Sequence, residues 1–201
     1  MAATSGSTLE AVVLAAGLSR RAGVFKPAFA AAGRPLLRHA VDGLRPWCRR
    51  VVVVTGHARL RTEGLVAGLE GVATVHNPRF DGDMFLSVQA GAAALAPDTG
   101  GFFVLPADCP FVGAEVYAAL VAAFGGQGGA RAVVPAHGGR GGHPVLLPAA
   151  ARGAILAAAP GATLRTVIRA HDPLRLAVAS PAVLADLDTP GDLAGLGDPE
   201  A

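Results

Sequence analysis

Apolar residues in the first 125 positions form two alternating kinds of pattern. Short apolar runs without polar alternation, such as 51–54, are typical of parallel strands buried on both faces of a sheet. Between the runs, apolar residues recur at helical spacing, as they do after Pro35, where proline suits a first helical turn. We expect strands at 11–15, 51–54, 72–75 and 101–105, and helices that begin near 35, 58, 84 and 116. This alternation predicts the α/β class, with a doubly wound, mostly parallel sheet between helices.

The pattern changes after the glycine-rich segment 125–129. Two strands joined by a glycine-rich turn predict a small β-hairpin there, and two short helices and one more strand follow. These elements are expected at 132–135 and 144–147, at 149–159 and 162–171, and at 174–179. Because the pattern contains no internal repeat, we predict a single domain over 9–198. A disordered tail is expected over 1–8, whose residues are small and polar.

Composition excludes several classes of protein. The 201 residues are 52% hydrophobic and 16% charged, with a net charge of +2 and no run of basic residues, so we expect no nucleic-acid partner. No stretch of about 18 residues is uniformly apolar, which predicts no membrane partner. Cys48 and Cys109 form no CxxC pair, so a cytoplasmic location is expected rather than a disulfide framework. Lys26 is the one lysine among the 17 basic residues; an arginine-favouring composition explains the 16 arginines but not the position of this exception.

The segment 14–27 follows the first expected strand, at the end of the sheet where ligands bind in open α/β proteins. Its small residues let backbone N–H groups approach a ligand, and Arg21 and Lys26 add positive charge. This combination suits a polyphosphate. Pro27 after the lysine excludes a Walker A loop, which needs Ser or Thr there. An ordinary surface loop is the alternative interpretation.

Three carboxylates are candidate metal ligands. Asp108 follows the strand expected at 101–105 and points toward the same crevice, where a carboxylate facing a triphosphate would bind Mg²⁺. Asp186 and Asp188 would share one face of an extended segment, and one of them is a candidate second ligand. The alternative is that Asp108 and Asp188 cap the helices that follow them.

Ser87 and His143 are weaker candidates. Ser87, near the start of the helix expected from 84, is placed to contact a base or ribose, or to cap the helix. His143 stands before Pro144, which favours a structural role over a catalytic one. The sequence contains no GxSxG or HExxH motif, so hydrolase and zinc-site chemistry lack support.

Four segments together resemble the MobA-like NTP transferases, the nucleotidyltransferases of the molybdenum-cofactor branch. The family's LAAGxSxRMGxxK motif, its PxDxP and GHP elements and its closing DxDTPxDL element are matched in order between residue 11 and about residue 196. The matching residues are Leu14, Ala15, Ala16, Gly17, Ser19, Arg21, Gly23, Lys26, Pro106, Asp108, Pro110, Gly142, His143, Pro144, Asp186, Asp188, Thr189, Pro190, Asp192 and Leu193. Three places depart from the pattern. Ala22 replaces the usual Met, and Cys109 stands where Gln is frequent. Asp83 and Leu86 alter a GMxSS segment.

The resemblance implies a three-layer, Rossmann-like fold of the nucleotide-diphospho-sugar transferase type. It also implies the reaction NTP + phosphorylated acceptor → NMP-acceptor + pyrophosphate, with catalytic roles for Lys26, Arg21 and Asp108. Mg²⁺ is the implied cofactor, held by Asp108 and Asp188, and His143 is the implied acceptor-binding residue. The implied nucleotide-binding residues are Leu14, Ala15, Ala16, Gly17, Ser19, Arg21, Lys26, Ser87 and Asp108.

Ala16 refines the expected substrates, because cytidylyl enzymes of this branch have LAAG where guanylyl enzymes tend to have LAGG. The expected nucleotide is therefore CTP and the expected acceptor molybdopterin, with a molybdoenzyme as the partner that receives the product. The alternatives are a guanylyl- or sugar-phosphate nucleotidyltransferase and, because the segment 82–87 is altered, a nucleotide-binding or cofactor-chaperone module without turnover. A Rossmann oxidoreductase is a distant alternative, since the first strand is not followed by its glycine fingerprint.

Overall fold

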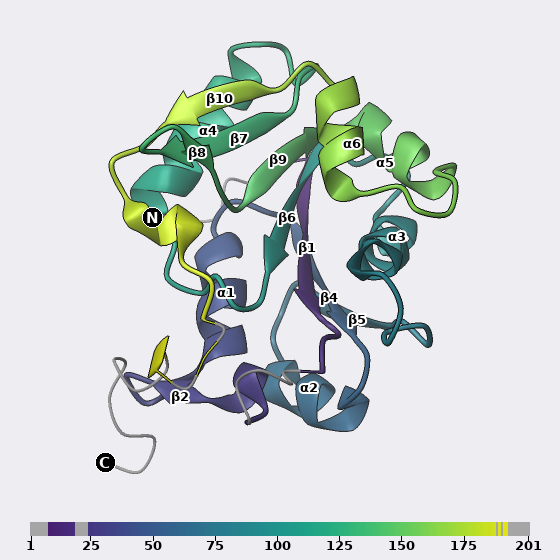
Figure 1. Cartoon of the computed structure of the whole chain (residues 1–201), viewed down its shortest axis with the longest axis vertical. Coiled ribbons are helices and arrows are strands. Elements are labelled where there is room, and N and C mark those ends of the chain that lie inside the picture. The colour runs from purple at the N-terminus through teal and green to yellow at the C-terminus, as the bar shows by residue number, and fades with distance from the viewer. Residues whose placement is uncertain (1–7, 19–23, 188, 190, 193–201) are drawn as a thin grey trace.

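A mostly parallel β-sheet forms the centre of the molecule (Figure 1). The computed structural model describes residues 8–18, 24–187, 189 and 191–192. The main-sheet strands are β1 (Leu9–Ala15), β4 (Arg50–Thr55), β5 (Val72–His76), β6 (Gly101–Pro106), β7 (Val133–His137), β8 (Arg140–Gly141), β9 (Val145–Pro148) and β10 (Leu174–Ala177). Their order is β10-β7-β9-β6-β1-β4-β5, and β8 pairs with β7. A separate two-stranded sheet joins β2 (Ala30–Ala31) to β3 (Arg34–Pro35).

Strand direction follows the predicted pattern over the first half of the chain. β1 pairs in parallel with β4 and with β6, and β4 pairs in parallel with β5. β9 is antiparallel to both β6 and β7, so the second strand of the expected hairpin lies within the main sheet. The tight turn after β7 leads instead to the short β8.

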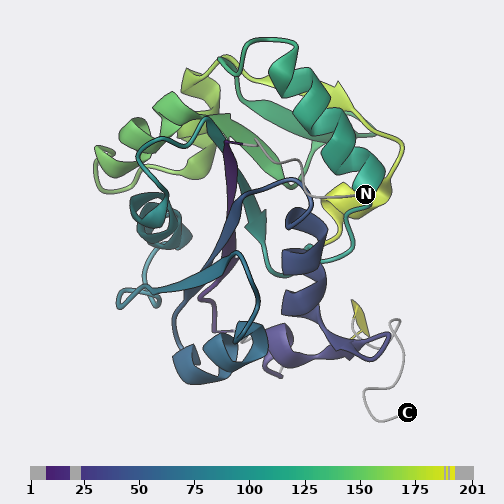
Figure 2. The same cartoon turned by 180° about the vertical axis from the view of Figure 1, so that it is seen from behind.

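Helices cover both faces of this sheet, as the two opposite views in Figures 1 and 2 show. They are α1 (Leu36–Leu44), α2 (Arg59–Val66), α3 (Met84–Ala94), α4 (Ala114–Gly125), α5 (Ala149–Leu156) and α6 (Leu164–Ala170), with 3₁₀ turns η1 (Lys26–Ala28) and η2 (Pro181–Leu184). No helix in the described part of the chain is long and apolar enough to span a bilayer.

Two apolar clusters show why the strands are continuous hydrophobic runs. Val13 of β1 packs in one cluster with residues of α1 and α4, whereas its neighbour Val12 packs in the other with residues of α3, α5 and α6. Successive side chains of a strand point to opposite faces, so a strand covered on both sides needs apolar residues at every position. The predicted three-layer α/β fold is therefore confirmed.

Element boundaries shift by a few residues from the sequence-based expectation. The predicted helix over 149–159 ends at Leu156, and the predicted strand over 174–179 ends at Ala177. Most of the expected N-terminal tail, residues 1–7, lies outside the described residues. Thr8 accepts a backbone hydrogen bond of 2.9 Å from Gly100.

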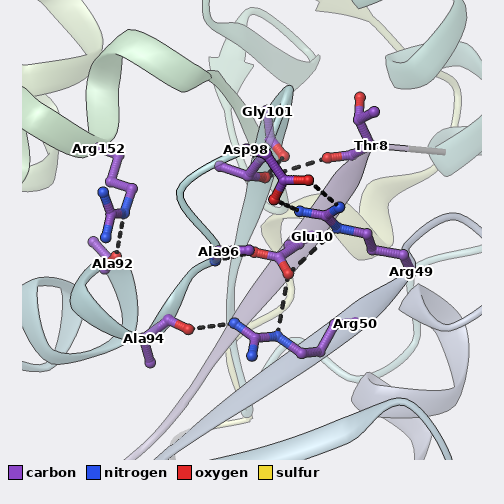
Figure 3. A network of polar contacts seen from close by, with 11 residues as sticks. Thr8, Glu10, Arg49, Arg50, Ala92, Ala94, Ala96, Asp98, Gly101 and Arg152 are labelled. Carbon is purple, nitrogen blue, oxygen red and sulfur yellow. Dashed lines mark hydrogen bonds and ion pairs between the residues drawn. The ribbon is translucent and has the colours of Figure 1, made fainter.

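A buried carboxylate joins the amino ends of the central strands (Figure 3). The side chain of Glu10 on β1 is only 2% exposed. Its Oε1 lies 3.1 Å from Nε of Arg50 and 3.5 Å from Nε of Arg49, and its Oε2 accepts a 2.7 Å hydrogen bond from the backbone N of Ala96. Arg49 reaches outward to the exposed Asp98 at 2.6 Å. This network ties β1 and β4 to the segment before β6.

Candidate functional site

The carboxyl ends of β1 and β6 lie side by side at the topological switch point of the sheet, where the strand order reverses. The chain first proceeds from β1 to β4 and β5 on one side, and then crosses to β6 on the other side of β1. Ligands of open α/β sheets bind in the crevice at such a switch point. The backbone N of Ala107 donates a 3.0 Å hydrogen bond to the O of Leu14, which joins the two loops that leave these strands.

Lys26 and Asp108 meet across this switch point. Lys26 begins the turn η1, which Pro27 anchors by its burial, and Asp108 follows the end of β6. Nζ of Lys26 lies 3.0 Å from Oδ2 of Asp108, and their side chains are 14% and 28% exposed. Two residues that the sequence singled out in separate segments are thus brought together. Both side chains are partly accessible to solvent, which a group that binds phosphate or a metal ion requires.

Asp186 joins Asp108 from the far end of the chain. One ligand atom from each of Asp108, Cys109 and Asp186 lies within 4.8 Å of the others. The backbone N of Leu187 donates a 3.1 Å hydrogen bond to the O of Asp108, which holds this segment in place. Asp188, the residue expected to bind the metal with Asp108, lies outside the described residues.

The donor set fits a hard divalent cation. Mg²⁺ and Mn²⁺ prefer carboxylate oxygens, which Asp108 and Asp186 supply. Burial raises the pKa of the Cys109 thiol, and its hydrogen bond to Asp186 raises that pKa further, so the sulfur stays protonated. A neutral thiol is a poor ligand for these cations. The alternative interpretation, in which Asp108 caps the next helix, is wrong, because Gly113 is the N-cap residue of α4.

His143 lies beside the acidic pair in a largely buried position. Burial lowers the pKa of its imidazole, while the nearby carboxylates of Asp186 and Asp108 oppose that shift. Among the described residues, its buried Nδ1 has no hydrogen-bond partner. Its backbone N donates to the O of Val183 at 2.8 Å, so the GHP segment supports the turn that leads to Asp186. A contact between His143 and an acceptor stays a prediction.

Ser87 has a buried partner. The side chains of Ser87 and Asn77 are buried, and Nδ2 of Asn77 donates a 3.0 Å hydrogen bond to Oγ of Ser87. Asp83 caps α3 by accepting a 2.8 Å hydrogen bond from the N of Phe85. The interpretation of Ser87 as the helix cap is therefore wrong, whereas its contact with a nucleotide stays a prediction.

Sequence reasoning missed Gly56, which follows β4 beside the first loop. A Cβ atom at Gly56 would lie 2.5 Å from both the O of Ala16 and the Cβ of Phe80. Only glycine therefore allows β4 and the loop after β1 to approach so closely. A glycine directly after a buried strand was the available signal. Of the other predicted loop residues, Leu14, Ala15 and Gly17 lie at or just after the end of β1, and Ser19, Arg21 and Gly23 lie outside the described residues.

Comparison with known proteins shows the family of this chain. The model of the MobA-like NTP transferase domain matches residues 11–174. The bifunctional protein GlmU of Paracidovorax citrulli is 36% identical over 127 residues, which are 60% of this chain and 26% of that protein. The molybdenum cofactor cytidylyltransferase of Escherichia coli is 24% identical over 111 residues, covering 55% of this chain and 57% of that protein. The chain thus spans about a quarter of the GlmU relative.

Solved structures show the same fold. Rv0371c from Mycobacterium tuberculosis superposes with a TM-score of 0.79 at 21% identity, over 94% of this chain and 97% of that chain. A second structure of Rv0371c, in complex with manganese, superposes with a TM-score of 0.73 at 20% identity, over the same shares of the two chains.

Proposed function

The chain belongs to the MobA-like NTP transferase family, and on that premise we propose that it transfers a nucleoside monophosphate from an NTP to a phosphorylated acceptor. The proposed nucleotide is CTP and the proposed acceptor is molybdopterin. The observation that carries the proposal is the meeting of Lys26, Asp108 and Asp186 at the switch point of the sheet. A cation beside two carboxylates suits a metal–triphosphate complex, which brings negative charge and a divalent ion together.

In the proposed reaction, a phosphate oxygen of the acceptor attacks the α-phosphorus in line. The bond from the α-phosphorus to the bridging oxygen of the β-phosphate breaks, and its electron pair leaves with pyrophosphate. Lys26 stabilises the charge that develops on the α-phosphate and on the leaving group, and Arg21 has the same proposed role. The protein supplies mainly position and charge, because phosphoryl-type transfer needs little covalent help.

Asp108 and Asp186 are the described residues that would hold the divalent cation, with Asp188 a further proposed ligand. When bound, Mg²⁺ neutralises phosphate charge and fixes the orientation of the triphosphate. The contact between Lys26 and Asp108 places the cationic side chain at the same point, so the lysine and the metal site would act on one phosphate chain. We propose Mg²⁺, rather than another hard cation, as the ion that these carboxylates bind.

Two observations support CTP and molybdopterin. Ala16 completes the LAAG motif that resembles the cytidylyl enzymes, and the similar E. coli protein is a molybdenum cofactor cytidylyltransferase. A Cβ atom at Gly56 would meet both Ala16 and Phe80, so we propose that Gly56 and Phe80 shape the nucleobase side of the crevice. A molybdoenzyme as the recipient of the product, and a cytoplasmic location suited to two cysteines without a disulfide, complete the proposal.

A panel assay tests this function. The protein is mixed with Mg²⁺, one of the four common NTPs and either molybdopterin or a sugar phosphate, and pyrophosphate release is measured. The proposal predicts the fastest release with CTP and molybdopterin, and loss of release in Lys26→Ala. Faster release with GTP or with a sugar phosphate would assign the alternative transferase activity. Binding of NTP without release from any pair would assign a module without turnover.

A further inference from the structure

Asp186 reaches the site through two contacts with adjacent residues of the β6 loop. The backbone N of Leu187 donates to the O of Asp108 at 3.1 Å, and Sγ of Cys109 donates to Oδ1 of Asp186 at 3.1 Å. Cys109 and Asp186 are 77 residues apart in the chain. The first contact fixes the backbone of the segment, whereas the second fixes the direction of the Asp186 side chain.

The thiol of Cys109 is built into this position. The residue is 1% exposed and packs in the apolar cluster that contains Leu105 and Val112. Its sulfur cannot turn toward solvent without leaving that cluster. The S–H group can donate one hydrogen bond, and Oδ1 of Asp186 at 3.1 Å is a nearer acceptor than Oδ1 of Asp108 at 4.0 Å.

We propose that Cys109 is a positioning residue of the metal site, whose thiol holds the carboxylate of Asp186 beside Asp108. This inference rests on the proposed function and deepens it, because it identifies Asp186 as the second acidic group and Cys109 as the donor that orients it. Partners that orient metal ligands typically change metal affinity by about 10–100-fold when they are removed. Removal of the Cys109 thiol should therefore lower the affinity for the metal ion more than it changes any other property of the protein.

The structure indicates that the Cys109 side chain can be replaced without loss of the fold. Without the thiol, the backbone contact between Leu187 and Asp108 remains, and so does the 2.8 Å contact from the N of His143 to the O of Val183. The segment 181–187 would stay attached while the Asp186 side chain gains freedom. Cys109→Ala is thus expected to fold, and Cys109→Ser is expected to restore the hydrogen bond through its hydroxyl.

Titration calorimetry with Mn²⁺ alone, without nucleotide, tests the proposal. We expect Cys109→Ala to weaken Mn²⁺ binding about tenfold or more, Cys109→Ser to bind nearly as the parent protein does, and Cys48→Ala to be unchanged. Cys48 is the matched control because it is the other cysteine and lies outside the site. Parent-like Mn²⁺ affinity in Cys109→Ala would overturn the proposal.

Asp108→Asn separates this inference from the proposed function. If Asp108→Asn binds Mn²⁺ as the parent does, the metal site itself fails and the proposed function with it. If Asp108→Asn loses Mn²⁺ and Cys109→Ala does not, only the positioning role fails.

Infrared spectroscopy gives a readout that does not depend on the folding of a Cys109 variant. In a Cys48→Ala background, the remaining S–H stretching band belongs to Cys109. A hydrogen bond to Asp186 lowers its frequency, and Asp186→Ala should shift the band upward. A band at the same frequency in both proteins would show that the thiol does not donate to Asp186, and would refute the proposal.

Discussion

Replacement of Glu10 by alanine should destabilise the fold without touching the candidate site. The change leaves the backbone N–H of Ala96 without its acceptor, and an unsatisfied buried donor costs about 1–3 kcal/mol. It also removes the partner of Arg49 and Arg50, and breaking a buried ion pair costs about 3–5 kcal/mol. These arginine side chains are 33% and 35% exposed, so water replaces part of the lost interaction. Because that hydration brings the ion-pair loss below the range for fully buried pairs, we expect a total of about 3 kcal/mol rather than the sum of the two figures.

Thermal and urea denaturation followed by circular dichroism would measure this loss. For a chain of this size, about 3 kcal/mol corresponds to a fall of roughly 6–12 °C in the melting temperature. Glu10→Gln should lose less, because its amide oxygen can still accept from Ala96. The control is Asp98→Ala, which removes the exposed partner of Arg49 and should change the melting temperature little. Equal losses in Glu10→Ala and Asp98→Ala would refute the reasoning that burial of Glu10 makes its contacts matter.

Three further predictions address the site and one helix. Lys26→Ala should lower the rate of pyrophosphate release about 10²–10³-fold with little change in melting temperature. Lys26→Arg should recover only part of that rate, because a planar guanidinium replaces a compact ammonium group. A parent-like rate in Lys26→Arg would show that positive charge alone suffices. Gly56→Ala should raise KM for the NTP and cost about 1–3 kcal/mol in urea denaturation, since its Cβ would meet the O of Ala16 at 2.5 Å, and an unchanged KM would separate Gly56 from the nucleotide. Thr163→Ala should cost about 1 kcal/mol at unchanged activity, because it removes the capping box of α6, and no measurable loss would mean that this cap is dispensable.

The strands were predictable because their apolar runs carry the signature of burial on both faces. The segments around Val12 and Val52 become β1 and β4, buried between two helical layers. The place of β9 was not predictable in the same way. Its pairing with β6 depends on which distant strand is free at the sheet edge, and local sequence does not encode that choice.

The candidate site was predictable in its parts and only partly in its assembly. Asp108 follows the end of one predicted strand and Lys26 lies in the segment that follows another, and these two strands pair in parallel. The acidic pair Asp186 and Asp188 was a candidate from its local pattern, but the place of Asp186 beside Asp108 was not predictable, because it depends on how a distant segment docks. The role of Cys109 was hidden for the same reason: a single cysteine in a loop does not reveal the carboxylate that it meets.

The docking of the segment 181–187 onto the β6 loop has a consequence for the timing of synthesis. Every strand of the main sheet precedes this segment in the chain, since β10 ends at Ala177. Lys26 and Asp108 are therefore both synthesised before Asp186, which lies in this segment. The second carboxylate arrives only afterwards. Under the proposed function, the metal site would therefore be the last part of the crevice to be completed during synthesis.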